Sequence, residues 1–296
     1  MIIGSRGSPL ALRQARWVAA QLPGAEIAVI KTTGDKITDA PLAQVGGTKA
    51  LFTKEIEEAL LDGRIDFAVH SMKDLPVEID ARLTIAAVPA REDARDALVG
   101  SRLAKLPEGA AVGTSSLRRA AQLRHVRPDL RVENLRGNVD TRLRKLDEGR
   151  YSAIVLAAAG LRRLGLAGRI TEVLEPEVMC PAIGQGALAI QARAGDERVL
   201  AALAPLDNAA ARIETTAERA MLAELGGGCQ VPVGGSARVA GDRLRLVAVV
   251  ASPDGAEMLR ASLEGPASDP GGLGRRAAQE LLSRGAGRIL EQVYAP

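Results

Sequence analysis

The stretch IIGSRGSPLALRQARWVAAQL, residues 2–22, sets the pattern that the first half of the chain repeats. A short apolar strand is predicted at residues 2–3, and a glycine-bearing loop ends it. Ser8 and Pro9 then offer an N-cap and a first-turn proline, so a helix is predicted over residues 10–22. A strand that leads directly into a helix is the repeating unit of α/β proteins.

Strand-like and helix-like runs continue to alternate along the chain. The first group has strands at 26–31, 67–70 and 83–88 and a helix at 52–61. The second has strands at 110–112, 132–135 and 153–156 and helices at 117–125 and 139–148. This order favours mostly parallel sheets with helices on their faces. We also predict a strand at 187–191 that returns toward the first group, and a lid in the long loop 33–51.

The pattern changes after a helix predicted at 209–225. Strands at 236–239, 244–250 and 258–263 and helices at 277–283 and 289–294 indicate a small α+β domain. The expected fold is therefore α/β, with two similar α/β domains around a cleft plus a smaller C-terminal α+β domain. The expected boundaries are residues 1–89 with 186–206, then 90–185, then 207–296.

The charge balance indicates a small anionic ligand. The chain has 39 basic and 36 acidic residues, and a net charge of +3 does not require nucleic acid as a partner. Aromatic residues make up 2% of the chain, so few side chains can stack on bases. Only 7 basic residues are lysines and 32 are arginines, the side chain suited to a bidentate grip on carboxylate or phosphate.

Several classes of protein are disfavoured. No run approaches the ~20 apolar residues of a membrane span, and the N-terminus lacks a basic leader before an apolar run, so we expect a cytoplasmic protein without a membrane partner. Two histidines and no C-x-x-C spacing exclude a histidine-rich metal site, and no metal is expected. His70 is expected to pack in its strand and His125 to lie at a helix end.

Two strand–loop–helix junctions resemble each other. The first carries Arg6 and Ser8, and the second carries Ser115, Ser116, Arg118 and Arg119. A helix N-terminus presents unpaired N–H donors, and hydroxyls with arginines would complete an anion site there. Ordinary capping with solvated arginines is the alternative at each junction. Arg136 directly follows a predicted strand and Arg142 lies one turn later, whereas Arg144, Arg150 and Arg169 are expected at the surface.

Two further residues are candidates for chemistry. Asp74 follows the predicted strand 67–70, where a carboxylate can act as acid, base or stabiliser of positive charge, or can form a turn or an ion pair. Cys229 lies in GGGCQVP, residues 226–232, where glycines leave room around the sulfur. The alternative for Cys229 is a small buried hydrophobic residue, and Cys180, beside Pro181, is expected to be a buried structural thiol.

Six segments together resemble the porphobilinogen deaminase (hydroxymethylbilane synthase) family. They lie in family order between residues 2 and 294: SRGSPLAL at 5–12, VHSMKDLP at 69–76, GTSSLRR at 113–119, LRGN at 135–138, PAIGQG at 181–186 and GGCQVP at 227–232. The family's glycine-rich lid often reads GGKGLF, whereas this chain has GGTKALF at 46–52. That departure leaves open the role of Lys49 and the mobility of the lid.

The resemblance implies two periplasmic-binding-protein-like α/β domains and an enzyme that joins four porphobilinogen molecules head to tail into hydroxymethylbilane, with release of ammonia. It implies a dipyrromethane cofactor bound through a thioether to Cys229, and Asp74 as the catalytic residue that stabilises positively charged intermediates. The implied cofactor-binding residues are Lys73, Ser115, Ser116, Arg118, Arg119, Arg142, Arg163 and Gln185. The implied substrate-binding residues are Arg6, Ser8, Arg136 and Arg142.

Two other functions remain possible from the residues alone. A two-lobed binding protein for an anion would explain the α/β halves and the arginines, but not the glycine-framed thiol or the third domain. A cysteine-dependent hydrolase would need a base near Cys229, and only His70 or His125 could serve. For the synthase we expect porphobilinogen as the small-molecule partner and a monomer. Because Cys229 follows the C-terminal end of a helix, the dipole disfavours a thiolate, which suits a sulfur that is alkylated once.

Overall fold

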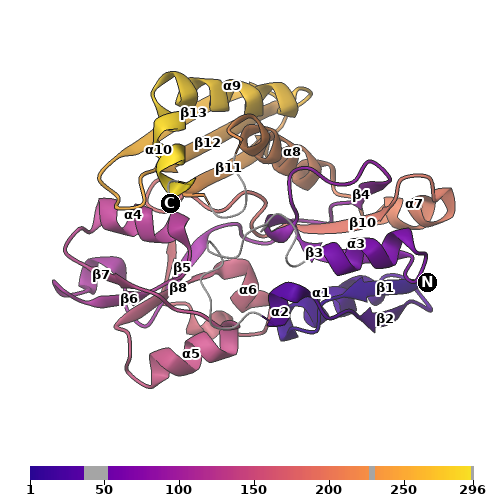
Figure 1. Ribbon diagram of the computed structural model, residues 1–296, viewed down its shortest axis with the longest axis horizontal. Coiled ribbons are helices and arrows are strands. Elements are labelled where there is room, and N and C mark those ends of the chain that lie inside the picture. Colours follow the sequence, from indigo (N-terminus) through magenta and orange to yellow (C-terminus); the bar gives the residue numbers. More distant parts are fainter. Residues whose placement is uncertain (37–52, 227–230, 295–296) are drawn as a thin grey trace. The chain divides into compact units, whose positions relative to one another are not determined.

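The computed structural model describes residues 1–36, 53–226 and 231–294 (Figure 1). The chain forms two compact units. The first unit comprises Met1–Glu92 and Ala187–Arg212, and the second comprises Asp93–Gly186 and Ile213–Pro296. The division into three domains and the cleft expected from the sequence stay predictions. Within the described ranges, no helix is both long and apolar enough to cross a bilayer.

The first unit is built on a five-stranded sheet with the order β2-β1-β3-β10-β4. Its strands are β1 (Ile2–Ser5), β2 (Glu26–Val29), β3 (Phe67–Ser71), β4 (Leu83–Ala87) and β10 (Leu188–Arg193). Its helices are α1 (Pro9–Ala19), α2 (Thr33–Lys36), α3 (Lys54–Leu61) and α7 (Glu197–Leu203), with short 3₁₀ turns η3 (Met72–Asp74) and η6 (Ala204–Leu206). Strand β1 is parallel to β2 and β3, whereas β10 is antiparallel to both β3 and β4.

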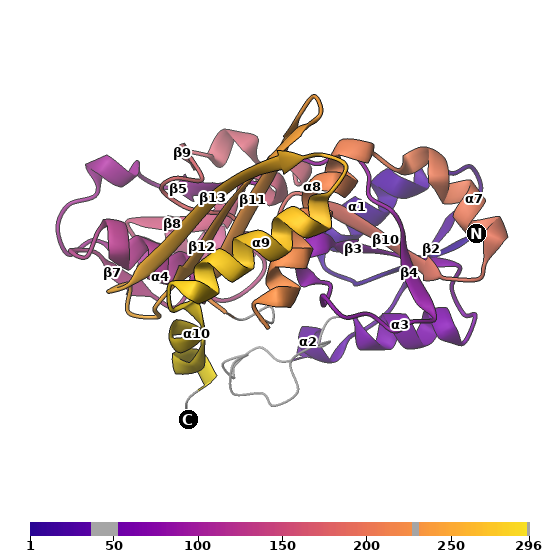
Figure 2. The same ribbon diagram turned by 90° about the horizontal axis from the view of Figure 1, so that it is seen from above.

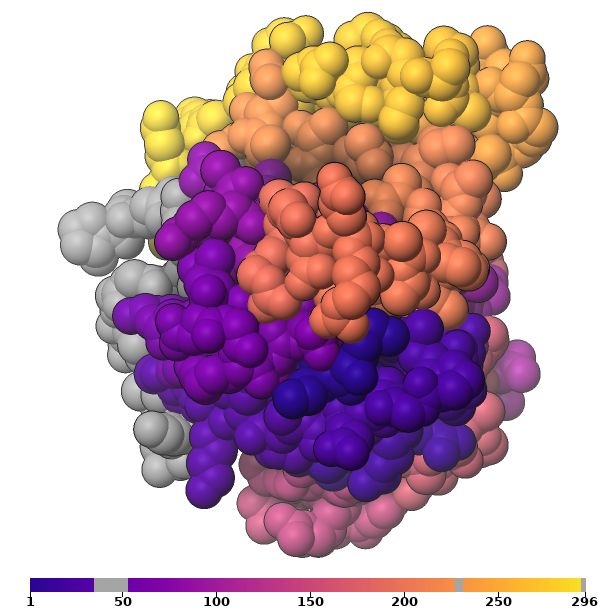
Figure 3. All heavy atoms as spheres, turned by 90° about the vertical axis from the view of Figure 1, so that its right-hand side faces the viewer, coloured from indigo at the N-terminus to yellow at the C-terminus, as the bar shows by residue number. Residues whose placement is uncertain are grey.

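Helices cover both faces of this sheet (Figure 2). On one face, Ala15 and Val18 of α1 and Val199 of α7 join a core with Phe67 and Ile190. On the other face, the apolar side of α3 packs on strand residues. The segment that carries β10 and α7, coral in Figure 3, lies against the N-terminal residues, as predicted for the returning strand.

The second unit contains a sheet of the same size with the order β7-β6-β8-β5-β9. Its strands are β5 (Asp96–Val99), β6 (Ala111–Gly113), β7 (Arg131–Glu133), β8 (Ala153–Ala157) and β9 (Glu172–Leu174). Its helices are α4 (Leu117–Val126), α5 (Val139–Asp147) and α6 (Ala158–Arg163), with 3₁₀ turns η4 (Leu103–Lys105) and η5 (Ala167–Arg169). Leu123 of α4 packs on one face, and Leu143 of α5 and Leu161 of α6 pack on the other.

The C-terminal part of the second unit is an antiparallel three-stranded sheet with helices. It contains α8 (Ala209–Glu224), β11 (Val233–Ala240), β12 (Arg243–Ala251), β13 (Met258–Pro266), α9 (Pro270–Ser283) and α10 (Ala286–Tyr294). The β12–β13 turn is bonded to α4, because Arg124 Nη1 donates to Pro253 O at 2.7 Å and His125 Nδ1 to Gly255 O at 2.9 Å. The predicted small α+β domain is thus confirmed, and so is the predicted position of His125 near a helix end.

The prediction of mostly parallel sheets is confirmed, because four of the five strands in each large sheet run in the same direction. Each large sheet has one strand, β10 or β5, that runs antiparallel to both of its neighbours. In the first unit that strand arrives from a distant part of the chain and is inserted between β3 and β4. The prediction of a loop throughout 33–51 is wrong at its start, where α2 forms. The remaining residues of the predicted lid, which include Lys49, lie outside the described residues.

Candidate active site

Asp74 is placed by the end of a buried strand. Strand β3 ends at Ser71, and η3 turns the chain so that Asp74 follows at once. Met72 and Leu75 are both buried in an apolar cluster with Ala187, and Leu75 N donates to Met72 O at 3.1 Å. The turn is therefore held by packing on both sides of Asp74, whose side chain stays 37% exposed.

Arg6, Ser8 and Asp74 meet in one pocket of the first unit. The closest atoms of the ion pair, Arg6 Nη1 and Asp74 Oδ2, are 4.0 Å apart, so the two groups attract each other without a tight hydrogen bond. The pocket has a volume of about 50 Å³, and its polar lining also includes Gln14, Thr53 and Ser71. Three residues predicted from two separate segments are thus brought together, and the carboxylate of Asp74 can accept a hydrogen bond there.

The serines of both predicted junctions cap their helices. Ser8 accepts a hydrogen bond from Ala11 N at 3.3 Å, and Ser116 accepts one from Arg119 N at 3.4 Å. Pro9 occupies the first turn of α1 as predicted. The capping interpretation therefore holds for these two hydroxyls, and Ser115 is exposed beside the second of them.

His70 is buried in β3, as predicted. Its Nε2 donates to Gln191 Oε1 at 3.1 Å, and Gln191 Nε2 in turn donates to Glu57 Oε1 at 2.9 Å. Burial, which removes water from the ring, lowers the pKa of His70 to about 4, and the positive charge of Arg6 acts in the same direction. His70 is therefore neutral at physiological pH.

We expect the stability of the fold to fall on acidification through His70. Between pH 6.5 and about 4 the unfolded chain binds a proton that the folded chain does not, so the free energy of unfolding falls as the pH falls. The contribution of this group is about 3 kcal/mol across that window. Urea unfolding of wild type and His70→Gln at pH 7 and pH 4.5 measures it. Equal losses of stability in the two proteins would contradict the assignment to His70.

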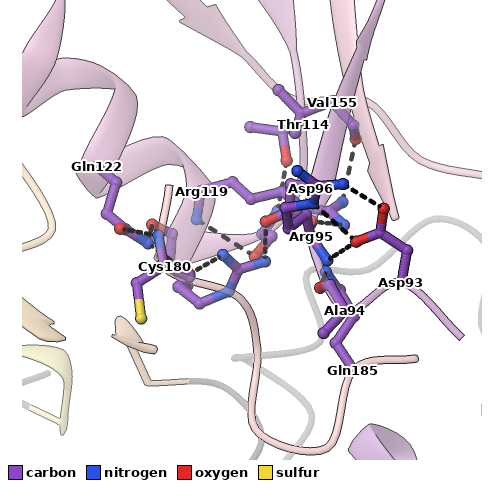
Figure 4. A network of polar contacts seen from close by, with 12 residues as sticks. Asp93, Ala94, Arg95, Asp96, Thr114, Arg119, Gln122, Val155, Cys180 and Gln185 are labelled. Carbon is purple, nitrogen blue, oxygen red and sulfur yellow. Dashed lines mark hydrogen bonds and ion pairs between the residues drawn. The ribbon is translucent and has the colours of Figure 1, made fainter. Parts of the chain in front are cut away.

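A buried carboxylate holds two predicted site residues in the second unit (Figure 4). Arg118 Nη2 lies 2.7 Å from Asp96 Oδ2, and Arg119 Nη2 lies 2.7 Å from Asp96 Oδ1. Arg118 also donates to Cys180 O, and Arg119 Nη1 donates to Val155 O at 3.0 Å. Both arginines are buried, so their guanidinium planes are fixed by the protein rather than by solvent.

The loop at Gly184–Gly186 contacts the carboxylate of Asp96 through the side chain of Gln185. Gln185 Nε2 donates to Asp96 Oδ1 at 2.8 Å and to Ala94 O at 2.7 Å. Gly184 N donates to Glu218 Oε2 at 2.7 Å, and Arg163 Nη2 donates to Gly186 O at 2.7 Å. Gln185 thereby lies on a short, bonded loop, and Arg163 of α6 is bonded to that loop.

Arg142 adds positive charge beside the buried pair. Burial, together with the positive charges of Arg119 and Arg136, lowers the pKa of Arg142 to about 10. Its Nε donates to Gly137 O at 2.7 Å, and no carboxylate among the described residues pairs with its guanidinium. Like charges gathered in this way favour an anionic ligand.

Several other predictions from the sequence are confirmed, and one predicted residue lies outside the described part of the chain. Arg144, Arg150 and Arg169 form exposed ion pairs, as predicted for surface residues. Cys180 is fully buried, which raises the pKa of its thiol to about 12 and confirms the prediction of a structural thiol. Lys73 is half-buried next to Asp74. Cys229 lies outside the described residues.

The buried acids Asp96 and Glu218 were not predicted. Asp96 begins β5, a four-residue strand, and Glu218 accepts hydrogen bonds from Gly184 N and from Ala237 N at 2.8 Å. A charged residue at the start of the apolar run 97–99 was the available signal for Asp96. For Glu218 the signal was an acidic residue on the apolar side of α8. Such a residue is expected to have a hydrogen-bond or ion-pair partner, because carboxylates are almost never fully buried unless they are paired.

The chain matches family models along most of its length. Residues 1–201 match the model described as "Porphobilinogen deaminase, dipyromethane cofactor binding domain", and residues 212–283 match "Porphobilinogen deaminase, C-terminal domain". The chain is 58% identical to the porphobilinogen deaminase of Roseiflexus sp. (strain RS-1), over 98% of each chain. It is 52% identical to that of Syntrophobacter fumaroxidans (strain DSM 10017 / MPOB), over 99% of this chain and 97% of the relative.

A solved periplasmic binding protein from Salmonella typhimurium is also similar, at 13% identity and a TM-score of 0.38 over 70% of this chain and 90% of that one. The matched domains define a transferase of tetrapyrrole biosynthesis that binds a dipyrromethane cofactor. The chain belongs to the porphobilinogen deaminase family.

Proposed function

We propose that the chain joins four porphobilinogen molecules into hydroxymethylbilane, releasing ammonia at each condensation, with Asp74 as the catalytic residue. The observation that carries this proposal is the pocket in which Asp74 stands beside Arg6 and Ser8 at the end of β3. Loss of ammonia leaves an electron-poor methylene-pyrrole, and a partly exposed carboxylate stabilises the positive charge that develops there. No nucleophile from the protein is needed, which agrees with the neutral, buried His70.

The arginines of the second unit suit a ligand that carries several carboxylates. Two guanidiniums share the single carboxylate of Asp96, and Arg142 is placed among like charges. This excess of positive charge fits a dipyrromethane, because each of its pyrroles bears two carboxylates. When bound, the cofactor supplies the free pyrrole carbon that starts the chain.

The proposed roles are those that the resemblance to the family implies. Cys229 would bind the cofactor covalently, and these residues would hold its carboxylates and pyrrole groups: Lys73, Ser115, Ser116, Arg118, Arg119, Arg142, Arg163 and Gln185. The substrate carboxylates would be bound by Arg6, Ser8, Arg136 and Arg142. Ser8 and Ser116 already accept helix N–H groups, so each would act by donating its hydroxyl hydrogen.

The wider context follows from the same function. A chain that acts on porphobilinogen and carries its own cofactor needs no nucleic acid, membrane or second subunit. We propose a cytoplasmic monomer divided into residues 1–89 with 186–206, then 90–185, then 207–296. The absence of a carboxylate partner for Arg142 among the described residues supports a small anion as the ligand.

Intact-mass measurement of purified protein tests the function. We expect the wild-type chain to carry the mass of a dipyrromethane, and Cys229→Ser to lack both that mass and activity. Cys180→Ser is the matched control and should keep the adduct, because the Cys180 thiol is buried and protonated. An unmodified Cys229 in an active wild-type enzyme would refute the proposal.

A further inference from the structure

Asp96 is a carboxylate that contacts three of the proposed cofactor residues in the second unit. It has no exposed surface, forms an ion pair with Arg118, and accepts hydrogen bonds from Arg119 and Gln185 (Figure 4). The two arginines approach different oxygens, since Arg118 Nη2 lies 2.7 Å from Oδ2 and Arg119 Nη2 and Nε lie 2.7 and 3.1 Å from Oδ1. A single side chain therefore contacts both guanidiniums, which also donate to the backbone carbonyls of Cys180 and Val155.

The stability of the fold does not account for this arrangement. Burying a carboxylate and two guanidiniums costs desolvation energy that their attraction repays only in part, and apolar residues of similar size often serve stability as well. One carboxylate also neutralises only one of the two guanidiniums, which leaves a positive charge in excess. An excess buried charge is explained when an anionic ligand completes the site.

We propose that Asp96 is a positioning residue for cofactor binding: it orients Arg118, Arg119 and Gln185 and leaves one positive charge for a ligand carboxylate. The assignment rests on the proposed function, and it concerns a residue that does not itself contact the ligand. The Gln185 side-chain amide donates to Asp96 Oδ1 and to Ala94 O, and the neighbouring Gly184 N donates to Glu218 Oε2. Removing the carboxylate would therefore take away the ion pairs of both arginines and one of the two hydrogen bonds of the Gln185 amide.

The charge state of Asp96 agrees with this role. Desolvation alone would raise its pKa, yet the two guanidiniums and the hydrogen bonds from Arg119 and Gln185 hold the pKa below its usual range. The carboxylate is thus ionised at every pH at which the enzyme works. Replacement by the isosteric amide removes a full charge while the volume stays the same.

The test compares cofactor loading in five variants of the full chain, measured by intact mass beside thermal unfolding. We expect Asp96→Asn to lower the fraction of chains with the Cys229 adduct at least about tenfold, the effect of losing hydrogen bonds to charged groups. Asp129→Asn is the matched control, because it makes the same change at the half-buried Arg127–Asp129 pair of the same unit. That control should keep wild-type loading.

A double-variant cycle separates positioning from a general loss of stability. If Asp96 acts through Arg119, the Asp96→Asn/Arg119→Gln chain loses less than the product of the two single losses. Losses that multiply would overturn the proposal. Should Asp96→Asn fail to fold, Asp96→Glu keeps the charge and displaces the guanidiniums, so reduced loading is expected in a folded protein.

The remaining outcomes distinguish this proposal from the function on which it rests. Wild-type loading in a folded Asp96→Asn or Asp96→Glu chain overturns the role of Asp96 and leaves the proposed function intact. A wild-type chain that makes hydroxymethylbilane without any adduct on Cys229 overturns both.

Discussion

Asp74→Asn is expected to fold normally and to lose turnover by about 10²- to 10³-fold, the size of effect seen when one group that stabilises transition-state charge is removed. Asparagine fills the same volume beside Arg6, and the neighbouring Met72 and Leu75 keep the η3 turn in place. What is lost is the negative charge opposite the cation that forms when ammonia leaves. Single-turnover measurement of ammonia release with porphobilinogen isolates this step.

The control for Asp74→Asn is Asp80→Asn. Asp80 belongs to the same unit and its carboxylate forms an ion pair with the exposed Arg82, so the same chemical change there should leave kcat and KM near wild type. The KM of Asp74→Asn should change much less than its kcat, because Arg6 and Ser8 are still present to bind substrate carboxylates. Near-normal turnover in a folded Asp74→Asn protein would remove Asp74 from the mechanism.

Gly274→Ala is expected to destabilise the second unit by at least about 2 kcal/mol through overpacking. A Cβ at Gly274 of α9 would stand 2.2 Å from Ala217 O and 2.9 Å from Met221 N, both backbone atoms of α8. Backbone cannot rotate away as a side chain can, so the two helices must separate. Urea unfolding with a probe in the second unit, and the thermal midpoint, measure the loss.

Gly271→Ala in the same helix supplies the matched comparison. A Cβ there meets only the flexible end of Arg275, at 3.3 Å, and alanine favours a helix over glycine by up to about 1 kcal/mol. We therefore expect Gly271→Ala to be neutral or stabilising. Equal effects of the two substitutions would show that the contact between α8 and α9 is not as close as described.

Local signals were enough to predict most of the framework. The N-caps at Ser8 and Ser116 and the proline at α1 are encoded within a few residues, and each lies where the pattern indicated. Strands β5 and β9 and helices α6 and α7 were not predicted because each is short. The antiparallel course of β10 could not be predicted, because it depends on pairing with β3 across more than a hundred residues.

The candidate site was also predictable from the sequence only in part. Arg6, Ser8 and Asp74 follow the ends of neighbouring parallel strands β1 and β3, so their meeting was foreseeable from strand order. The burial of Arg118 and Arg119 against Asp96 was not foreseeable. Nothing near residues 118–119 in the sequence reveals a carboxylate that belongs to a separate strand. Roles that depend on charge can be read from strand ends, whereas the partners that orient those charges come from packing.

The burial of Cys180 lowers the reactivity of one of the chain's two cysteine thiols. A protonated thiol enclosed between α4 and β12 gives no signal to an alkylating dye under native conditions. If Cys229 binds the cofactor as proposed, a chain without cofactor is expected to take up one dye molecule, and a chain that carries it none. Because the buried Cys180 thiol takes up no dye, dye uptake by the folded enzyme would report the fraction of chains that lack the cofactor.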